Sequence, residues 1–230
     1  MDIIPTAEDL QNPRIPSDLR SFVVRALHAI SRDKAAKEAT RLWLGQAKEL
    51  MREILPISYF APWRWPNDDV LIQPQLGSQG YDAKILTLDG KPLTALEVSW
   101  AVNGKVHIEN MIALNENGAS IQTMDDNELD AAVNRTIIAS QTKARNDYRD
   151  YLLLLVFDVL PLFYLEEDRH WKIIQGMYEQ LVKMQFVASE VYLLLFPPDY
   201  VTSHGLNPII RIDNANKSLK PIAGRCPAPA

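Results

Sequence analysis

Two acidic residues on what the sequence predicts to be neighbouring strands are the main candidates for chemistry. Asp82 follows a glycine-containing turn in GYDAKI, and Glu97 lies in the run ALEVSW. Between them, Asp89-Gly90 predicts a tight hairpin turn, because Asp tolerates left-handed backbone angles and Gly adopts them freely. Two carboxylates on adjacent strands suit a divalent cation such as Mg²⁺, which prefers hard oxygen ligands.

The stretch that carries these acids, residues 70–104, predicts three short strands. Side chains alternate along a strand, so one face of the third strand is apolar and consists of Leu96, Val98, Trp100 and Val102. Glu97 falls on the opposite face with Ala95, Ser99 and Ala101. The alternation predicts that one face of this strand packs on a core.

A helical segment precedes the predicted strands and an aromatic segment links the two. Residues 19–55 are rich in helix-forming residues, with a predicted break near residues 31–33 and an end at Pro56. Phe60, Trp63 and Trp65 follow among prolines, which predicts a loop whose rings cover one end of the core. The alternative is a platform that stacks on nucleic-acid bases beside Arg64.

The sequence after residue 104 predicts helices that alternate with strands. The expected order is a strand or extension at 105–114, a helix at 127–148, a strand at 151–158, a helix at 168–185 and a strand at 191–196, with an edge strand within 200–212. This pattern predicts an α/β fold with a mixed central sheet flanked by helices. We expect an extended arm at 1–16, one domain at 17–213 with a helical N-terminal part at 17–55, and a loose tail at 214–230.

Composition narrows the class of protein. The chain has 230 residues, a formal net charge of −5 and a sequence pI of about 5.4, so any contact with nucleic acid must come from a local patch. A single cysteine, Cys226, and four scattered histidines offer neither a disulfide nor a zinc site. We find no signal peptide, and the longest apolar run is too short to span a bilayer, so we expect a cytoplasmic protein.

The order of elements and the acidic pair together resemble the restriction-endonuclease-like, PD-(D/E)XK superfamily of nucleases. That core is a helix, a three-strand meander, a helix and a further strand, and here it would span about 47–196. The resemblance implies that Asp82 and Glu97 are catalytic and bind Mg²⁺ or Mn²⁺. It also implies a further acidic metal ligand on the preceding helix, matched by Glu49 in AKELMREIL.

One departure from the family pattern concerns the motif lysine, which is Ser99 here. In active members that lysine orients the attacking water and stabilises developing negative charge, and serine supplies no positive charge. Lys143 in SQTKARNDY, on the following helix, is the candidate replacement. Gln141 is a second candidate, as a polar group that positions water, and Lys84 is a third.

Three hypotheses follow from these residues. The first is a divergent metal-dependent nuclease that hydrolyses phosphodiester bonds of nucleic acid at Asp82 and Glu97. The second is an inactive nuclease-fold protein that binds a protein or a nucleic acid. The third is an unrelated α/β binding domain with an accidental resemblance. A homodimer is compatible with each of them.

Overall fold

A computed structural model describes residues 4–77, 80–118, 126–159, 167–203 and 207–212 of the chain. Its centre is a six-stranded mixed sheet in which spatial order follows sequence order. The strands are β1 Leu71–Pro74, β2 Ala83–Leu86, β3 Pro92–Trp100, β4 Tyr148–Asp158, β5 Ala188–Phe196 and β6 Ile209–Arg211. β1 to β3 form an antiparallel meander, β3, β4 and β5 run parallel, and β6 is antiparallel to β5.

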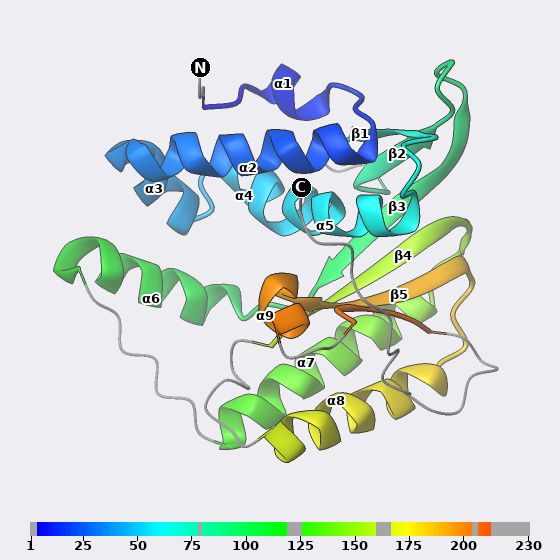
Figure 1. The fold of residues 1–230 in the computed structure, drawn as a ribbon. Coiled ribbons are helices and arrows are strands. Elements are labelled where there is room, and N and C mark those ends of the chain that lie inside the picture. Colours follow the sequence, from blue (N-terminus) through cyan, green and yellow to red (C-terminus); the bar gives the residue numbers. More distant parts are fainter. Residues whose placement is uncertain (1–3, 78–79, 119–125, 160–166, 204–206, 213–230) are drawn as a thin grey trace.

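Helices cover both faces of this sheet, so the α/β expectation is confirmed (Figure 1). The N-terminal helices α1 to α5 lie on one face, with α7 and α8 on the other. Their bounds are α1 Ala7–Gln11, α2 Pro16–Arg32, α3 Lys34–Arg41, α4 Ala47–Glu49, a π-helical turn η1 Leu50–Ile54, α5 Leu55–Arg64, α6 Gly104–Asn117, α7 Asp126–Ala144, α8 Glu167–Val182 and α9 Pro198–Ser203. None of the helices in the described ranges is long and apolar enough to cross a membrane.

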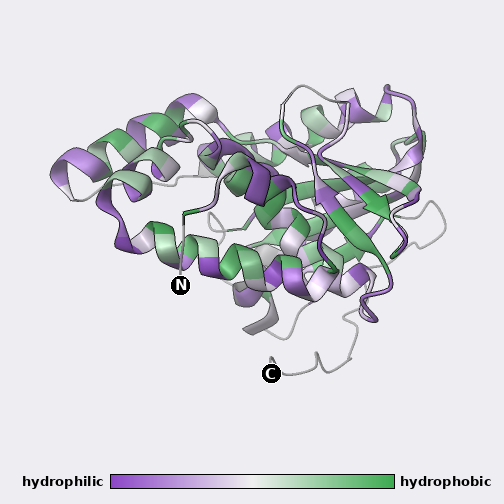
Figure 2. Ribbon diagram, turned by 90° about the horizontal axis from the view of Figure 1, so that it is seen from above, coloured by the Kyte–Doolittle hydropathy of each residue, from purple (hydrophilic) through white to green (hydrophobic). Residues whose placement is uncertain are grey.

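Alternation along the strands divides the interior into two cores. Leu96, Val98 and Leu154 face α2 and α5, whereas Leu153 and Leu155 face α7 and α8. The central stretches of β4 and β5, residues 152–157 and 191–195, are therefore continuously apolar, as expected for strands buried on both faces. Figure 2 shows this as green strands at the centre, surrounded by helices that carry both green and purple residues.

The structure corrects the sequence-based prediction for the segment that follows Pro56. The helix does not end there but continues from Ala47 to Arg64 through the π-helical turn, so the expected aromatic loop is helical. The Leu55 N–H bonds to the Leu50 carbonyl, five residues back, and this change of register falls next to Pro56, which has no N–H to bond. Phe60 is fully buried, so its ring packs into the core as predicted.

Two further segments differ from their predicted conformation. The expected strand or extension at 105–114 is the helix α6, which starts where the Asn103 side chain accepts from the Val106 N–H and ends at Gly118 with φ of 70°. Asn at an N-cap and Gly at a C-cap are local signals that override the apolar pattern. The N-terminal arm contains α1, and α2 already begins at Pro16. The expected tail lies outside the described residues.

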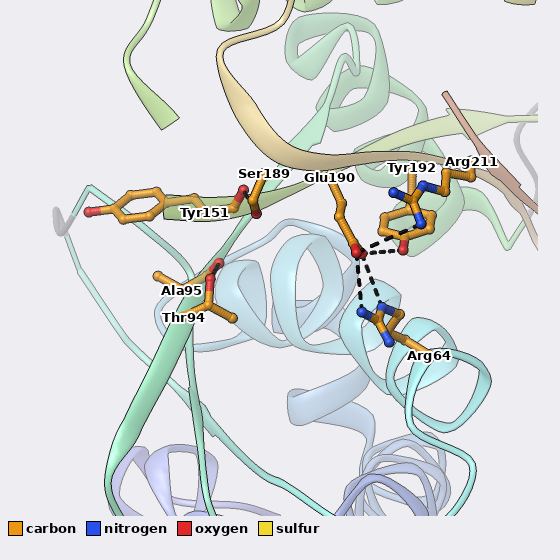
Figure 3. A network of polar contacts seen from close by, with 8 residues as sticks. All are labelled: Arg64, Thr94, Ala95, Tyr151, Ser189, Glu190, Tyr192 and Arg211. Carbon is orange, nitrogen blue, oxygen red and sulfur yellow. Dashed lines mark hydrogen bonds and ion pairs between the residues drawn. The ribbon is translucent and has the colours of Figure 1, made fainter. Parts of the chain in front are cut away.

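A half-buried carboxylate ties α5 to the far strands of the sheet. Glu190 on β5 accepts two hydrogen bonds from the Arg64 guanidinium, at 3.1 and 3.2 Å, and one from the Tyr192 hydroxyl (Figure 3). The Arg211 guanidinium on β6 lies 3.8 Å from it. Burial opposes the charge of Glu190, but the hydrogen bonds from Tyr192 and Arg64 outweigh burial and lower the pKa of this carboxyl.

Replacing Glu190 by glutamine is therefore expected to destabilise the fold. The substitution leaves the Arg64 guanidinium without a charged partner, which lowers the free energy of unfolding by about 1–2 kcal/mol in a urea titration. Glu38→Gln is the matched control, because the Glu38 side chain is 40% exposed and lies 3.9 Å from Lys34. The control should change stability by less than about 0.5 kcal/mol. Equal effects in both variants would contradict the prediction.

Candidate functional site

Asp82 and Glu97 lie close together at the start of the β2–β3 hairpin. Asp82 directly precedes β2, whose first residue, Ala83, pairs with Leu96, and Glu97 is the next residue of β3. The Asp82 N–H donates to the Leu96 carbonyl at 2.9 Å, and the Asp82 carboxylate accepts from the Val98 N–H at 2.7 Å. The two carboxylates are close enough for the charge of Glu97 to raise the pKa of Asp82.

The position of Asp82 makes its ionisation unfavourable. Burial, and next the charge of Glu97, raise the pKa of Asp82 to about 6, although the Val98 N–H and the cations Lys143 and Arg52 act in the opposite direction. Two adjacent carboxylates in a poorly solvated place repel each other. A cation bound between them would relieve this repulsion.

Lys143 reaches this pair from α7. Its ammonium donates to Glu97 Oε1 and lies 3.4 Å from the Tyr148 hydroxyl, which also accepts from the Asn146 amide at 3.1 Å. Burial would lower the pKa of Lys143, but the hydrogen bond to Glu97 and its charge raise it above its ordinary value. The ammonium therefore stays charged beside the two carboxylates.

A third acid, Glu53, belongs to the same site and was missed by the sequence analysis. It lies in the π-helical turn η1, where burial, followed by the charges of Asp82 and Glu49, raises its pKa to about 8. Glu53 keeps its proton while Asp82 ionises, so the charge of Asp82 acts on Glu53. The signal was present in AKELMREIL, because Glu49 and Glu53 are four residues apart and share one helix face.

Arg52, also in η1, completes the surroundings of the acids. Its guanidinium donates to the Trp100 carbonyl at the end of β3, at 3.0 Å, and lies 5.2 Å from the centre of the Trp43 ring. Its Nε is buried without a hydrogen-bond partner. Arg52 and Glu53 both come from the π-helical turn, a local irregularity that often occurs at functional sites.

The other predicted residues take less direct positions. Glu49 acts on Glu53, and its charge is not among the influences on Asp82. Gln141 is exposed on α7, about 200° around the helix from Lys143, and its role as a water-positioning group stays a prediction. Lys84 lies on β2 opposite Ala95, and within the described ranges no ion pair joins it to either acid.

The side chains at Asp82 and Glu97 meet the requirements of a metal site only in part. Asp82 and Glu97 supply carboxylate oxygens, but the described residues contain no group of three or more His, Cys, Asp or Glu side chains arranged to hold a metal ion. Mg²⁺ usually keeps several waters and needs only one or two protein carboxylates, so the pair suffices for such a site.

Comparison with protein-family models, curated proteins and solved structures finds no match to this chain.

The ion pair between Lys143 and Glu97 should contribute to stability. Both side chains are largely buried, with 24% and 11% of their surfaces exposed, so each protects the other from being an unpaired charge. A double-mutant cycle of Lys143→Met and Glu97→Gln is expected to give a coupling energy of about 1–3 kcal/mol in urea unfolding. The exposed Lys105–Glu109 pair on α6 is the control and should give less than about 0.5 kcal/mol. A value as small for the buried pair would contradict this geometry.

Glu53 should make stability fall as pH rises. Its folded-state pKa lies above the ordinary value of 4.5, so its contribution is fully present below pH 4.5 and is lost as pH rises through about 8. Glu53→Gln is expected to be more stable than the wild type at about pH 9, by about 1–2 kcal/mol after discounting for solvent screening, and the gain should shrink at about pH 5. Urea unfolding at both pH values measures it, and a gain independent of pH would refute the assignment.

Proposed function

We propose that this chain is a divergent metal-dependent nuclease of the PD-(D/E)XK type, which hydrolyses phosphodiester bonds of nucleic acid at Asp82 and Glu97. The observation that carries the proposal is the position of Lys143. Its ammonium, delivered by α7, lies at the carboxylate pair, where Ser99 on β3 supplies no charge. A positive charge held beside two acids is the combination that phosphoryl transfer requires.

The arrangement of elements supports the same proposal. A helix running from α4 to α5, the β1–β3 meander, α7 and β4 occur in the order expected for this core, with α6 as an additional helix between β3 and α7. β4 lies parallel beside β3, with Leu153 opposite Glu97. The acidic strand is therefore held on both sides, by β2 and by β4, and the two carboxylates are fixed relative to α7.

Asp82 and Glu97 would hold the metal, Mg²⁺ or Mn²⁺, with Glu53 as the nearby third acid. A bound divalent ion polarises the phosphate and lowers the pKa of its water. The raised pKa of Asp82 supports this assignment. Burial and the charge of Glu97 disfavour the ionised form of Asp82, and a bound cation would stabilise that form. Lys143 holds the Glu97 carboxylate in place and offers its remaining N–H donors to a phosphoryl oxygen.

The second candidate is a binding protein that keeps this fold without catalysis. The ion pair itself favours it, because Lys143 already neutralises Glu97 and the described residues hold no group of three metal-binding side chains. The two candidates differ in one measurable property, the affinity of the acidic pair for a divalent cation.

Calorimetric titration of Mn²⁺ and Mg²⁺ tests that difference. The wild type is expected to bind one of these ions, and the double variant Asp82→Asn, Glu97→Gln should lose binding because both carboxylates are gone. Asp89→Asn is the matched control, since Asp89 is an exposed acid in the β2–β3 turn, paired with Lys91. Absence of binding in the wild type would reject the nuclease and favour the binding protein.

Cleavage of single- and double-stranded DNA and RNA, with Mg²⁺ or Mn²⁺ added, tests the role of Lys143. Lys143→Ala is expected to lower the rate by about 10²–10³-fold, the usual effect of removing one charge-stabilising donor. Lys105→Ala, on the exposed surface of α6, should leave it unchanged. Cleavage that persists in the double acid variant would come from a contaminant or another site and would refute the proposal.

A further inference from the structure

A cavity of about 410 Å³ lies at the carboxyl ends of β3 and β4. Trp100, Phe157 and Asp158 form its floor at the ends of the two strands, and residues of α6 and α7 form its sides. Ligands of α/β proteins commonly bind outside the carboxyl ends of parallel strands. The volume falls in the range of sites for small molecules, about 300–1,000 Å³.

The wall contributed by α7 contains a cation, Arg135, that has no partner among the residues the structure describes. Arg135 lines the cavity, and its Nε is buried without a hydrogen-bond partner. No hydrogen bond or ion pair joins its guanidinium to another residue in the described part of the chain. A half-buried guanidinium without a carboxylate is costly, because water no longer solvates it fully and nothing replaces that water.

Two acids share this cavity with Arg135. Glu128 and Asp158 both line the cavity, and each already has an interaction of its own. Arg135 is the only Lys or Arg among the lining residues, all of which the structure describes. Within this lining, Arg135 is therefore the cation that an anionic group of a ligand can meet.

The opposite wall is formed by α6, which is anchored through His107 and contributes the polar side chain of Asn110. His107 on α6 donates from Nε2 to the Arg41 carbonyl at 2.9 Å and stacks on Trp43 at 3.8 Å, which anchors this part of α6. The amide of Asn110 lines the cavity on the same helix, and Val106 and Met111 add apolar surface. An organic body can pack here while its charged end meets Arg135.

We propose that the cavity between α6 and α7 binds a small organic oxyanion, a carboxylate or a phosphate monoester, whose charged group pairs with Arg135. The planar guanidinium forms two parallel hydrogen bonds with either group. Trp100, Val106 and Met111 receive the organic body. This proposal does not depend on the nuclease proposal, since Arg135 precedes Lys143 by eight residues, about 12 Å along the axis of α7.

Calorimetric titration of the full chain with phenyl phosphate, benzoate and inorganic phosphate tests the proposal. At least one of the two organic probes is expected to bind, and more tightly than inorganic phosphate. Binding of phenyl phosphate alone assigns a phosphate monoester, and binding of benzoate alone assigns a carboxylate. If neither organic probe binds at millimolar concentration, the proposal is wrong.

Variants of Arg135 then locate the bound probe. Arg135→Gln is expected to lower the affinity at least about tenfold, the effect of losing hydrogen bonds to a charged group. Arg145→Gln, an exposed arginine near the end of the same helix, should bind like the wild type. The double variant Asp82→Asn, Glu97→Gln should also retain binding, which separates this cavity from the acidic site.

A conservative variant keeps the test decisive if Arg135→Gln does not fold. Arg135→Lys retains the charge and loses the paired hydrogen bonds, so its affinity should fall severalfold. Thermal unfolding without ligand gives a second readout, because removing an unpaired buried charge should leave the protein at least as stable as the wild type. Unchanged affinity in the Arg135 variants, or a marked loss of stability in both of them, would overturn the proposal.

Discussion

The buried carboxylate of Glu97, with 8% of the residue exposed, is the constraint on which the site depends. It lies in β3 between β2 and β4, where water cannot solvate it, so it needs a partner charge from another element. Lys143 supplies that charge from α7, and Tyr148 at the start of β4 holds the ammonium. The position of α7 against the sheet and the chemistry of the acids are thus linked by one ion pair.

The same two elements also build the second candidate site. β3 carries Glu97 at its middle and Trp100 at its end, and α7 carries Lys143 near its end and Arg135 further back. One strand and one helix therefore position an acidic pair with a lysine, and a separate cavity with an arginine. The two sites differ in the group that would meet a charged ligand, which is a carboxylate at Asp82 and a guanidinium at Arg135.

The hydrogen-bond network around Glu190 holds the other half of the sheet, and it differs from the acidic site in its charge balance. Glu190 accepts hydrogen bonds from Arg64 and Tyr192, and lies 3.8 Å from Arg211, so its oxygens are fully engaged. A carboxylate surrounded by two guanidinium groups has no repulsion to relieve by binding a cation. This contrast with Asp82, whose pKa is raised to about 6, separates a structural acid from a candidate ligand.

The sequence by itself determined the hairpin that carries the two acids and most of the other strands. Alternation, the Asp89-Gly90 turn and the apolar runs are local patterns, and they predicted that Asp82 and Glu97 lie close together in a mixed sheet flanked by helices. They left Lys143 and Gln141 as alternative partners for the acids.

Only the tertiary structure decided between these candidates and added those that were missed. Which face of α7 meets β3 depends on packing against the whole sheet, and so does the choice of Lys143. The π-helical turn that brings Glu53 to Asp82 depends on a shift of backbone hydrogen bonds beside Pro56, which composition does not reveal. The cavity at Arg135 forms between α6, which the sequence did not predict as a helix, and the ends of two strands, so it depends on contacts distant in sequence.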